Sequence, residues 1–450
     1  MSNEKKSNEV PAPAAPEPEY AAFVALDWAD QKHDWQMVAA GSQKREKGEL
    51  DNTPEAVMAW VANLSERFGS RPIAVSLEQS RGSLVYMLLK FPQLVLFPVH
   101  PNTAAHFREA FQPSGSKSDT SDAGLLLSIL LQHRDRLRRL QPDTAETRLL
   151  QRLVEQRRQM VNDKTRYSNR LTACLKLYFP QMLKWFDDVT SPLVGALLER
   201  WPSLEELQRA HDGTLRKFFH QQNCRSEERI RERIDAIRQA VPATTDPGVL
   251  GAEAVVAGGL IALIATLRAE ISELDTRIAE AFAAHPERAL FDSLPGAGPV
   301  MGPRLLVAFG TNRQRFTSAD EMQCYSGIAP VTVASGKSEW VHFRWACPKF
   351  LRQTFHEFAG HSLVKCVWAR AYYDLQIHNG KSHHAAVRAL AFKWIRVLFR
   401  CWKDGKPYDE QVYLQSLQKR NSPLKGLLPS ATGLGWNDVA GFQKFSENPS

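Results

Sequence analysis

The chain has few cysteines, and none of them form a closely spaced pair. Its 450 residues include only 6 cysteines, scattered from Cys174 to Cys401. Zinc ribbons and disulfide frameworks both need cysteines in a regular, repeated spacing. The pattern therefore excludes a zinc ribbon and argues against a disulfide scaffold, which leaves oxygen or histidine as the ligands of any metal.

The sequence also lacks a long uninterrupted apolar run. The most apolar stretch, Val255 to Leu267, contains two glycines and is shorter than the roughly 18 apolar residues of a membrane span. The opening residues, MSNEKKSNEV, have no apolar segment after their lysines, unlike a secretory signal. We therefore expect a cytoplasmic protein that does not associate with a membrane.

Positive charge is in modest excess overall, but it is concentrated in one window. The formal net charge is +8, from 57 Lys and Arg against 49 Asp and Glu. Residues 337–403 alone hold 12 Lys and Arg against 3 acids, together with 5 of the 11 tryptophans. A basic surface interleaved with aromatics suits a nucleic acid, whose bases can stack. A solvated helical face with tryptophans in the core is the alternative.

The first third of the chain alternates between strand-like and helix-like segments. Residues 1–19 are rich in Pro, Ala and Glu and are typical of a disordered tail. Next come a predicted hairpin (AAFVALDW and WQMVAA), a helix from Thr53 to Phe68, and strands in RPIAVSLEQS and LVLFPVHP, with LVYMLLKF as a helix between them. This order predicts an α/β domain with a largely buried sheet over residues 20–140.

The remainder is predicted to be mostly helical. Apolar residues recur every three or four positions from Ala145 to Tyr178 and again from Leu260 to Phe282. Such seams indicate two long helices, packed antiparallel or against a partner chain. We therefore predict a helical, coiled-coil or oligomerisation segment over residues 141–288, a mostly α C-terminal domain over residues 289–420, and a loop-like tail over residues 421–450.

Four acids in the first domain form a candidate metal site. Asp27 and Glu78 end predicted strands, at the sheet edge where ligands bind in open α/β folds. Asp119 and Asp122 lie three residues apart at a predicted helix start, so both carboxylates share one face. Clustered oxygens without Cys or His favour Mg²⁺, which can activate a nucleophile at a phosphodiester. Each acid taken singly also fits an ordinary exposed carboxylate or helix cap.

The order Asp, Glu, then Asp-x-x-Asp resembles the DEDD arrangement of RuvC-type nuclease domains, which have an RNase-H-like fold. The flanks VALDW, VSLEQS and SKSDTSDAGLL are similar to those of one group, the insertion-sequence transposases of the family numbered one hundred and ten, the bridge-RNA-guided recombinases. The resemblance implies that residues 20–140 form an RNase-H-like (RuvC type) domain.

The resemblance continues in the C-terminal domain and covers most of residues 20–403. SLPGAGPVMGPRLL resembles the family's glycine-rich hairpin, in which Gly296 and Gly298 would let backbone N–H groups bind a phosphate. A purely structural turn is the alternative. RFTSADEMQCYSGIAPVTVASGKS resembles the family's next motif and puts Ser335 at the position of the serine nucleophile. Lys337 departs from the family, which often has a second glycine there.

The resemblance implies a mechanism and partners. Ser335 would attack the DNA backbone, while the four acids, contributed across a subunit interface, would bind Mg²⁺. A structured guide (bridge) RNA would select the DNA by base pairing, leaving backbone and shape to the protein. The protein would act as a homo-oligomer, either a dimer or a tetramer. Ser326 and Ser338 are rival nucleophiles, and an ordinary turn serine is the alternative for Ser335 itself.

RWACPKFLRQTFHEFA and HHAAVRALAFKWIRVLF resemble the family's two closing helices, which supply basic residues to nucleic acid. Most of these residues would act by charge on phosphates rather than by reading bases. The candidates are Lys337, Arg344, Lys349, Arg352, Arg388, Lys393, Arg396 and Arg400.

Three functions fit these residues. The first is a transposase or recombinase that cuts and rejoins DNA strands. The second is a junction-resolving endonuclease that uses metal-activated water, with Ser335 structural. The third is a catalytically inactive, element-derived nucleic-acid-binding protein.

Overall fold

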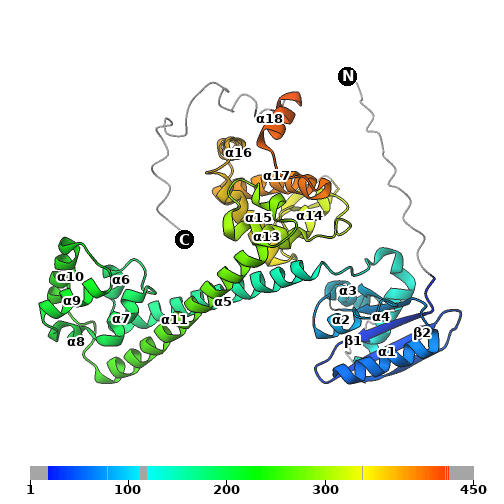
Figure 1. The fold of residues 1–450 in the computed structure, drawn as a ribbon, viewed down its shortest axis with the longest axis horizontal. Coiled ribbons are helices and arrows are strands. Elements are labelled where there is room, and N and C mark those ends of the chain that lie inside the picture. Colours follow the sequence, from blue (N-terminus) through cyan, green and yellow to red (C-terminus); the bar gives the residue numbers. More distant parts are fainter. Residues whose placement is uncertain are drawn as a thin grey trace. The chain divides into compact units, whose positions relative to one another are not determined.

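The computed structural model describes residues 19–78, 80–111, 119–336, 338–420, 422 and 424, without the side chains of residues 119–121 (Figure 1). The chain divides into two compact units, residues 1–142 and residues 143–450. The first is a mixed α/β unit and the second is mostly helical. The sequence predicted this succession of a sheet domain and a helical region.

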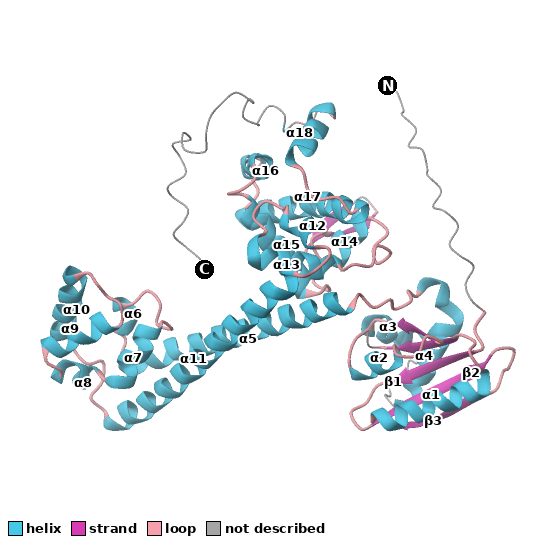
Figure 2. Cartoon of the chain, viewed as in Figure 1, coloured by secondary structure: helices cyan, strands magenta, loops and turns pink. Residues whose placement is uncertain are grey.

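The first unit is built on a mixed five-stranded sheet with the order β3-β2-β1-β4-β5 (Figure 2). The pairs β1–β2 and β2–β3 are antiparallel, and β1–β4 and β4–β5 are parallel. The predicted hairpin is therefore confirmed as β1 and β2. The strands are β1 (Ala22–Asp27), β2 (Lys32–Ala39), β3 (Arg45–Asp51), β4 (Ile73–Leu77) and β5 (Leu94–Pro98).

Helices cover both faces of this sheet. The central strands are apolar on both sides, so both faces must be buried. Val24 and Leu26 of β1 pack in the core that α1 and α2 complete, whereas Ala25 packs against α4. The predicted cap of the first helix is also present, since the Thr53 hydroxyl accepts a hydrogen bond from Ala56 N at 3.2 Å. The helices are α1 (Pro54–Phe68), α2 (Ser83–Leu88), α3 (Pro101–Phe111) and α4 (Asp119–His133), followed by the 3-10 turn Arg134–Arg136.

Neither β3 nor α3 is predicted from the sequence. The strand β3 reads REKGELD, and its charges suit an exposed edge strand rather than the apolar pattern of a buried one. A Cβ atom at Gly48 would lie 2.8 Å from the ring of Trp35, so the glycine lets that indole cover the strand. Edge strands are specified by their neighbours more than by their own hydrophobicity.

The second unit contains two long helices, α5 (Ala145–Tyr178) and α11 (Pro247–Ala283), that pack antiparallel along each other (Figure 1). Val154 of α5 shares a core with Phe282 of α11, and Arg157 forms an ion pair with Asp275. The seams therefore pack against each other within the chain, which is one of the two arrangements that the sequence left open.

Helix α11 is long and apolar enough, by length and composition, to cross a membrane. Its most apolar 18-residue window has a mean hydropathy of 2.0, and 17% of that window is buried. It is the one such helix in the described part of the chain. This is a weak indicator, because α11 lies against the highly charged α5 and forms an ion pair with it.

Five short helices between α5 and α11 form a separate core. Their apolar residues pack with Leu171 and Leu175 of α5 and with Leu260 and Ile264 of α11. The helical character predicted for this insert is therefore confirmed. The helices are α6 (Met182–Trp185), α7 (Pro192–Arg200), α8 (Leu204–Arg209), α9 (Asp212–Gln221) and α10 (Glu227–Gln239).

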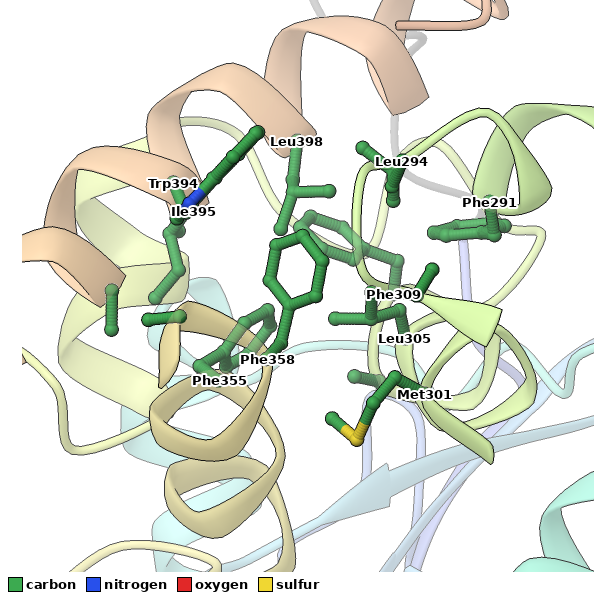
Figure 3. Close-up of a cluster of buried hydrophobic side chains, with 14 of the residues drawn as sticks. Phe291, Leu294, Met301, Leu305, Phe309, Phe355, Phe358, Trp394, Ile395 and Leu398 are labelled. Carbon is green, nitrogen blue, oxygen red and sulfur yellow. The ribbon is translucent and has the colours of Figure 1, made fainter. Parts of the chain in front are cut away.

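The C-terminal part of the second unit packs around a core of aromatic side chains. Figure 3 shows Phe309, Phe355, Phe358 and Trp394 converging from three helices, and Trp394 Nε1 donates to Ser362 Oγ at 2.8 Å. The elements are α12 (Arg288–Asp292), α13 (Gly298–Phe309), α14 (Ala319–Tyr325), β6 (Val331–Ser335), β7 (Ser338–His342), α15 (Lys349–Ser362), α16 (Val367–His378), α17 (His383–Asp404) and α18 (Glu410–Lys419).

One element of this part was not expected from the sequence. Residues 331–342 form an antiparallel hairpin of β6 and β7, inside the domain that the sequence predicts to be mostly α. Four residues in a row, Val331 to Ala334, are β-branched or small, and the positive φ of +59° at Gly336 permits a tight turn. The C-terminal domain is therefore mostly, but not entirely, helical.

Candidate active site

Asp27 and Glu78 leave the sheet side by side. Leu26 of β1 pairs in parallel with Leu77 of β4, and each acid is the next residue. Neighbouring strands lie about 4.8 Å apart, so the two backbones deliver their carboxylates to the same carboxyl edge. Both residues are half-buried. The sequence predicted this placement from the strand-end position of each acid.

Both acids belong to the sheet face that α4 covers. Side chains alternate along a strand, and Ala25 and Ser76, two residues before each acid, both contact α4. Ser76 Oγ donates to Leu126 O at 3.1 Å. One turn further along α4, Leu130 packs with Ala74. The helix thus runs antiparallel to β1 and β4.

This register places Asp122 near the carboxyl edge of the sheet that holds Asp27 and Glu78, which we call the acidic edge. One helical turn, four residues, advances about 6 Å, close to the advance of two strand residues. Because α4 and β4 run in opposite directions, the distance from Leu126 back to Asp122 along the helix is close to the distance from Ser76 forward to Glu78 along the strand. Asp122 is only 5% exposed, and its Oδ1 accepts a hydrogen bond from Arg108 Nη2 of α3 at 2.6 Å. Asp119 begins α4, but its side chain is outside the described part.

The sequence missed two residues here, Arg108 and Asp34. Asp34 of β2 is directly opposite Asp27 in the antiparallel pair, so its side chain is on the same face. Asp34 belongs to β2, which begins at Lys32, earlier than the predicted strand segment WQMVAA. The signal for this strand in the sequence is the alternation of the buried His33 with its polar neighbours Lys32 and Asp34.

The donor chemistry of this edge fits a hard cation, since it offers carboxylates without cysteine. Within the described residues, however, no group of three or more His, Cys, Asp or Glu side chains is close enough to hold a metal ion. Asp122 is engaged by Arg108 instead. A three-acid site would therefore require Asp122 to exchange this guanidinium for the ion.

Ser335 is the last residue of β6, at the exposed end of the hairpin. It pairs with Ser338 of β7, and Gly336 follows it with a φ of +59°. Lys337 lies outside the described residues. Of the described side chains, none forms a hydrogen bond with the Ser335 hydroxyl, so none of them is in place as its general base. An exposed hydroxyl on a narrow projection suits attack on a large substrate.

The rival serines differ in accessibility. Ser326 is fully buried, and its Oγ donates to Gln323 O at 3.2 Å, which closes the end of α14. A buried hydroxyl that already donates cannot reach a DNA backbone. Ser338 is exposed across the hairpin from Ser335 and keeps its place as an alternative.

The two glycines of the PGAGP motif have different surroundings. Gly296 has a φ of +82°, and a Cβ atom there would lie 2.9 Å from the backbone oxygen of His361. Gly298 has a φ of +53°, with open space around it, and is the first residue of α13. Gly296 therefore packs against α15, and only Gly298 has room for a ligand.

The predicted basic residues fall into separate groups. Arg352 and Arg388 lie over the Phe343 ring, with guanidinium carbons 4.6 and 4.4 Å from its centroid. Arg344 Nε donates to Ala329 O at 3.3 Å, and Arg352 Nη1 donates to Arg344 O at 3.2 Å. These three arginines thus lie together at the base of the hairpin, two of them over one aromatic ring. No carboxylate of the described chain forms an ion pair with any of them.

The other candidates are elsewhere on α15 and α17. Lys349 and Arg396 are exposed, and Arg400 pairs with Asp404 at 3.6 Å. Lys393 Nζ lies 4.6 Å from the ring centroid of Tyr372, and burial lowers its pKa. Lys393 therefore packs against α16, unlike the exposed Lys349 and Arg396.

Positive charge around Phe343 is crowded. Burial lowers the pKa of Arg388, and the nearby Arg352 lowers it further. His356 lies 5.7 Å from His384, ring to ring, and burial followed by His384 and Arg388 lowers its pKa below the ordinary value. An anion placed here would relieve this repulsion.

The five tryptophans of the basic window, residues 337–403, divide into a buried set and an exposed set. Trp368, Trp394 and Trp402 are buried in the core, as one reading of the sequence predicted. Trp340 and Trp345 are exposed, as the other reading required. Composition could not separate these sets, because burial depends on which helix face meets α13 and α15.

Comparison with known proteins agrees with this arrangement. Residues 24–180 match the DEDD transposase family of IS110 elements, and residues 288–374 match the transposase family IS116/IS110/IS902. The first match includes the acidic edge of the sheet, and the second includes the β6–β7 hairpin.

Relatives match over most of their length. The protein named as the candidate mini-circle transposase of IS117 from Streptomyces coelicolor is 28% identical over 86% of this chain and 95% of its own. The uncharacterized 43.6 kDa protein of insertion element IS110, from the same organism, is 26% identical over 87% of this chain and 96% of its own. The uncharacterized 42 kDa protein of IS900 from Mycobacterium paratuberculosis is 24% identical over 86% and 96%. The chain is therefore a member of the IS110 family of transposases.

Proposed function

We propose that this protein cuts and rejoins the DNA strands of an insertion sequence, with Ser335 as nucleophile. The observation that carries the proposal is the exposure of Ser335 at the turn of the β6–β7 hairpin, whose opposite end carries an arginine cluster that no described carboxylate neutralises. Attack by the serine Oγ on phosphorus would form a phosphoserine bond and break one DNA phosphodiester bond. The serine proton leaves and the departing DNA oxygen gains one, so the strand can later be rejoined by the reverse exchange.

The acidic edge of the first unit is proposed as the second half of the site, in an RNase-H-like domain. Its support is the mixed sheet with helices on both faces and with Asp27 and Glu78 adjacent at its carboxyl edge. Asp27, Glu78, Asp119 and Asp122 would hold Mg²⁺, which when bound would stabilise charge on the reacting phosphate. Ser335 needs such help, because a serine hydroxyl is a weak nucleophile at neutral pH.

The nucleic-acid partners are proposed to be DNA and a structured guide RNA. The cationic residues exposed on α15 and α17 offer backbone contacts, which carry no sequence information themselves. Sequence selection would then be left to pairing between RNA and DNA. We place this activity in the cytoplasm, and we propose a homo-oligomer in which one subunit's hairpin meets the acidic edge of another.

The proposal is tested by covalent DNA attachment. Purified protein, Mg²⁺, cognate DNA and RNA are incubated, and DNA-linked protein is measured after denaturation. We expect no covalent product from Ser335→Ala and full product from Ser338→Ala, the matched serine across the hairpin. Asp27→Asn should reduce the rate at least about 100-fold, because one carboxylate ligand is lost.

Each other outcome identifies a different function. If Ser335→Ala still forms the covalent product, another residue is the nucleophile. If Ser335→Ala cuts DNA normally while Asp27→Asn does not, water is the nucleophile and the protein is a junction-resolving endonuclease. If the parent protein binds nucleic acid without cutting it, this copy is catalytically inactive.

A further inference from the structure

Trp345 is an unusually exposed aromatic residue that no core requires. Its relative exposure is 80%, and that of Trp340 on β7 is 45%. A large indole left in water gives up the apolar burial that normally stabilises a tryptophan in a fold. Among the described aromatic rings, Trp345 pairs with Phe343 in a T-shaped arrangement, with the two centroids 4.9 Å apart and an interplanar angle of 67°. One flat aromatic face is thus available to a partner.

The surroundings of Trp345 are cationic. Phe343, its neighbour, is the ring that Arg352 and Arg388 overlie. Arg344 is adjacent in sequence, and its guanidinium is tied to the backbone of residues 329 and 330. The aromatic face and the charge are therefore fixed relative to each other. We call Phe343, Arg344, Trp345, Arg352 and Arg388 the tryptophan–arginine surface.

A small cavity opens beside these residues. Its volume is about 150 Å³, and Phe343, Arg344 and Arg388 line it together with residues 327–330 and 341–342. One water occupies about 30 Å³ in the liquid, so the cavity has room for a phosphate group or a single flat ring. A double helix could not enter it.

We propose that the tryptophan–arginine surface binds an unpaired nucleotide of the DNA next to the cleaved strand, with its base stacked on Trp345 and its phosphate held by Arg352 and Arg388. This rests on the proposed function of the Ser335 hairpin. Paired bases in a duplex hide their faces from side chains, whereas splayed bases stack on aromatic rings regardless of sequence. The absence of a described carboxylate partner for these arginines favours a polyanion over a protein surface.

The test compares single-stranded and duplex DNA of the same sequence, binding to the full-length protein. The readout is fluorescence anisotropy of a labelled oligonucleotide. We expect Trp345→Leu to weaken single-strand binding by about 5- to 150-fold, since base stacking contributes about 1–3 kcal/mol per base. Duplex affinity should change less than about twofold. Trp345→Phe should restore most of the single-strand affinity.

Two controls support the assignment. Tyr86→Leu removes an aromatic that is 43% exposed in the first unit and should leave both affinities unchanged. Arg388→Ala should weaken both DNA forms and reduce by about one the slope of log affinity against log salt, because one phosphate contact is lost.

Three results would overturn the proposal. The first is a Trp345→Leu variant whose single-strand affinity stays within about twofold of the parent. The second is a loss of duplex affinity as large as the loss of single-strand affinity. Alternatively, Trp345→Leu could reduce the oligomer's mass in solution, which would make the surface a contact with a second copy. None of these depends on the covalent assay, so the proposed function of Ser335 stands or falls separately.

Discussion

At the scale of single residues, similar sequence features acquire different roles through their surroundings. Gly296 and Gly298 both adopt positive φ, but only Gly296 approaches another backbone. Ser326 and Ser335 are both serines followed by glycine, but one is buried and the other exposed. The spacing of residues in the chain therefore does not determine which member of each pair is available for chemistry.

The glycine pair yields a prediction about stability. Gly298→Ala should cost about 1 kcal/mol, since left-handed backbone is disfavoured for a residue with a Cβ atom. Gly296→Ala should cost about 2–5 kcal/mol, because its Cβ would also collide with the backbone of His361, which cannot rotate away. Urea unfolding of the full-length protein measures both. Equal costs would mean that the approach to α15 is looser than the structure indicates.

At the scale of elements, packing decides which charges meet. Helix α4 is held in register by Ser76 and by Leu130, and that register brings Asp122 to the acidic edge. Helix α3 supplies Arg108, which neutralises Asp122 in the present arrangement. A cation bound at the acidic edge would therefore compete with this arginine for the Asp122 carboxylate.

Arg108→Ala should expose that competition. Removing one member of a largely buried pair should cost up to about 3 kcal/mol of unfolding free energy without added metal. If Asp122 is a metal ligand, Mg²⁺ should then raise the Tm of this variant more than that of the parent, because binding stabilises only the folded state.

The control is Arg67→Ala, which breaks the exposed pair with Glu46. It should cost at most about 1 kcal/mol and leave the response to Mg²⁺ unchanged. A purely structural role for Asp122 would instead give an Arg108→Ala protein that is destabilised to the same extent with and without Mg²⁺.

At the scale of the whole molecule, helix α11 has apolar side chains that the described residues leave partly exposed. Val256 and Leu263 of α11 are seven residues apart, so they lie on the same side of the helix, and they are 42% and 46% exposed. Apolar side chains exposed on one face of a helix favour contact with a partner. A second copy of the chain is the occupant that the proposed oligomer requires.

Leu263→Glu should therefore shift the protein towards the monomer, because a charge would be buried at the interface. Light scattering coupled to size-exclusion chromatography measures the mass. Val241→Glu places the same charge at a residue that is 76% exposed outside α11 and should leave the mass unchanged. If neither variant changes the mass of the oligomer, the interface lies elsewhere.

The sequence determined much of this protein by itself. Periodicity located β1, β2, β4, β5 and the long helices, because burial on one or both faces imposes a regular apolar spacing. Strand-end position predicted that Asp27 and Glu78 would share an edge, because parallel strands end together. The local motif around Ser335 pointed to the family.

Tertiary structure decided the rest. Whether the α5 and α11 seams meet within the chain depends on the length and fold of the insert between them, which periodicity does not encode. The hairpin of β6 and β7 is exposed on nearly every residue, so it has no apolar pattern to reveal it. The division of the basic window into core tryptophans, an arginine cluster and a packed Lys393 follows from helix faces and their neighbours. These are long-range contacts, and only the folded chain brings their members together.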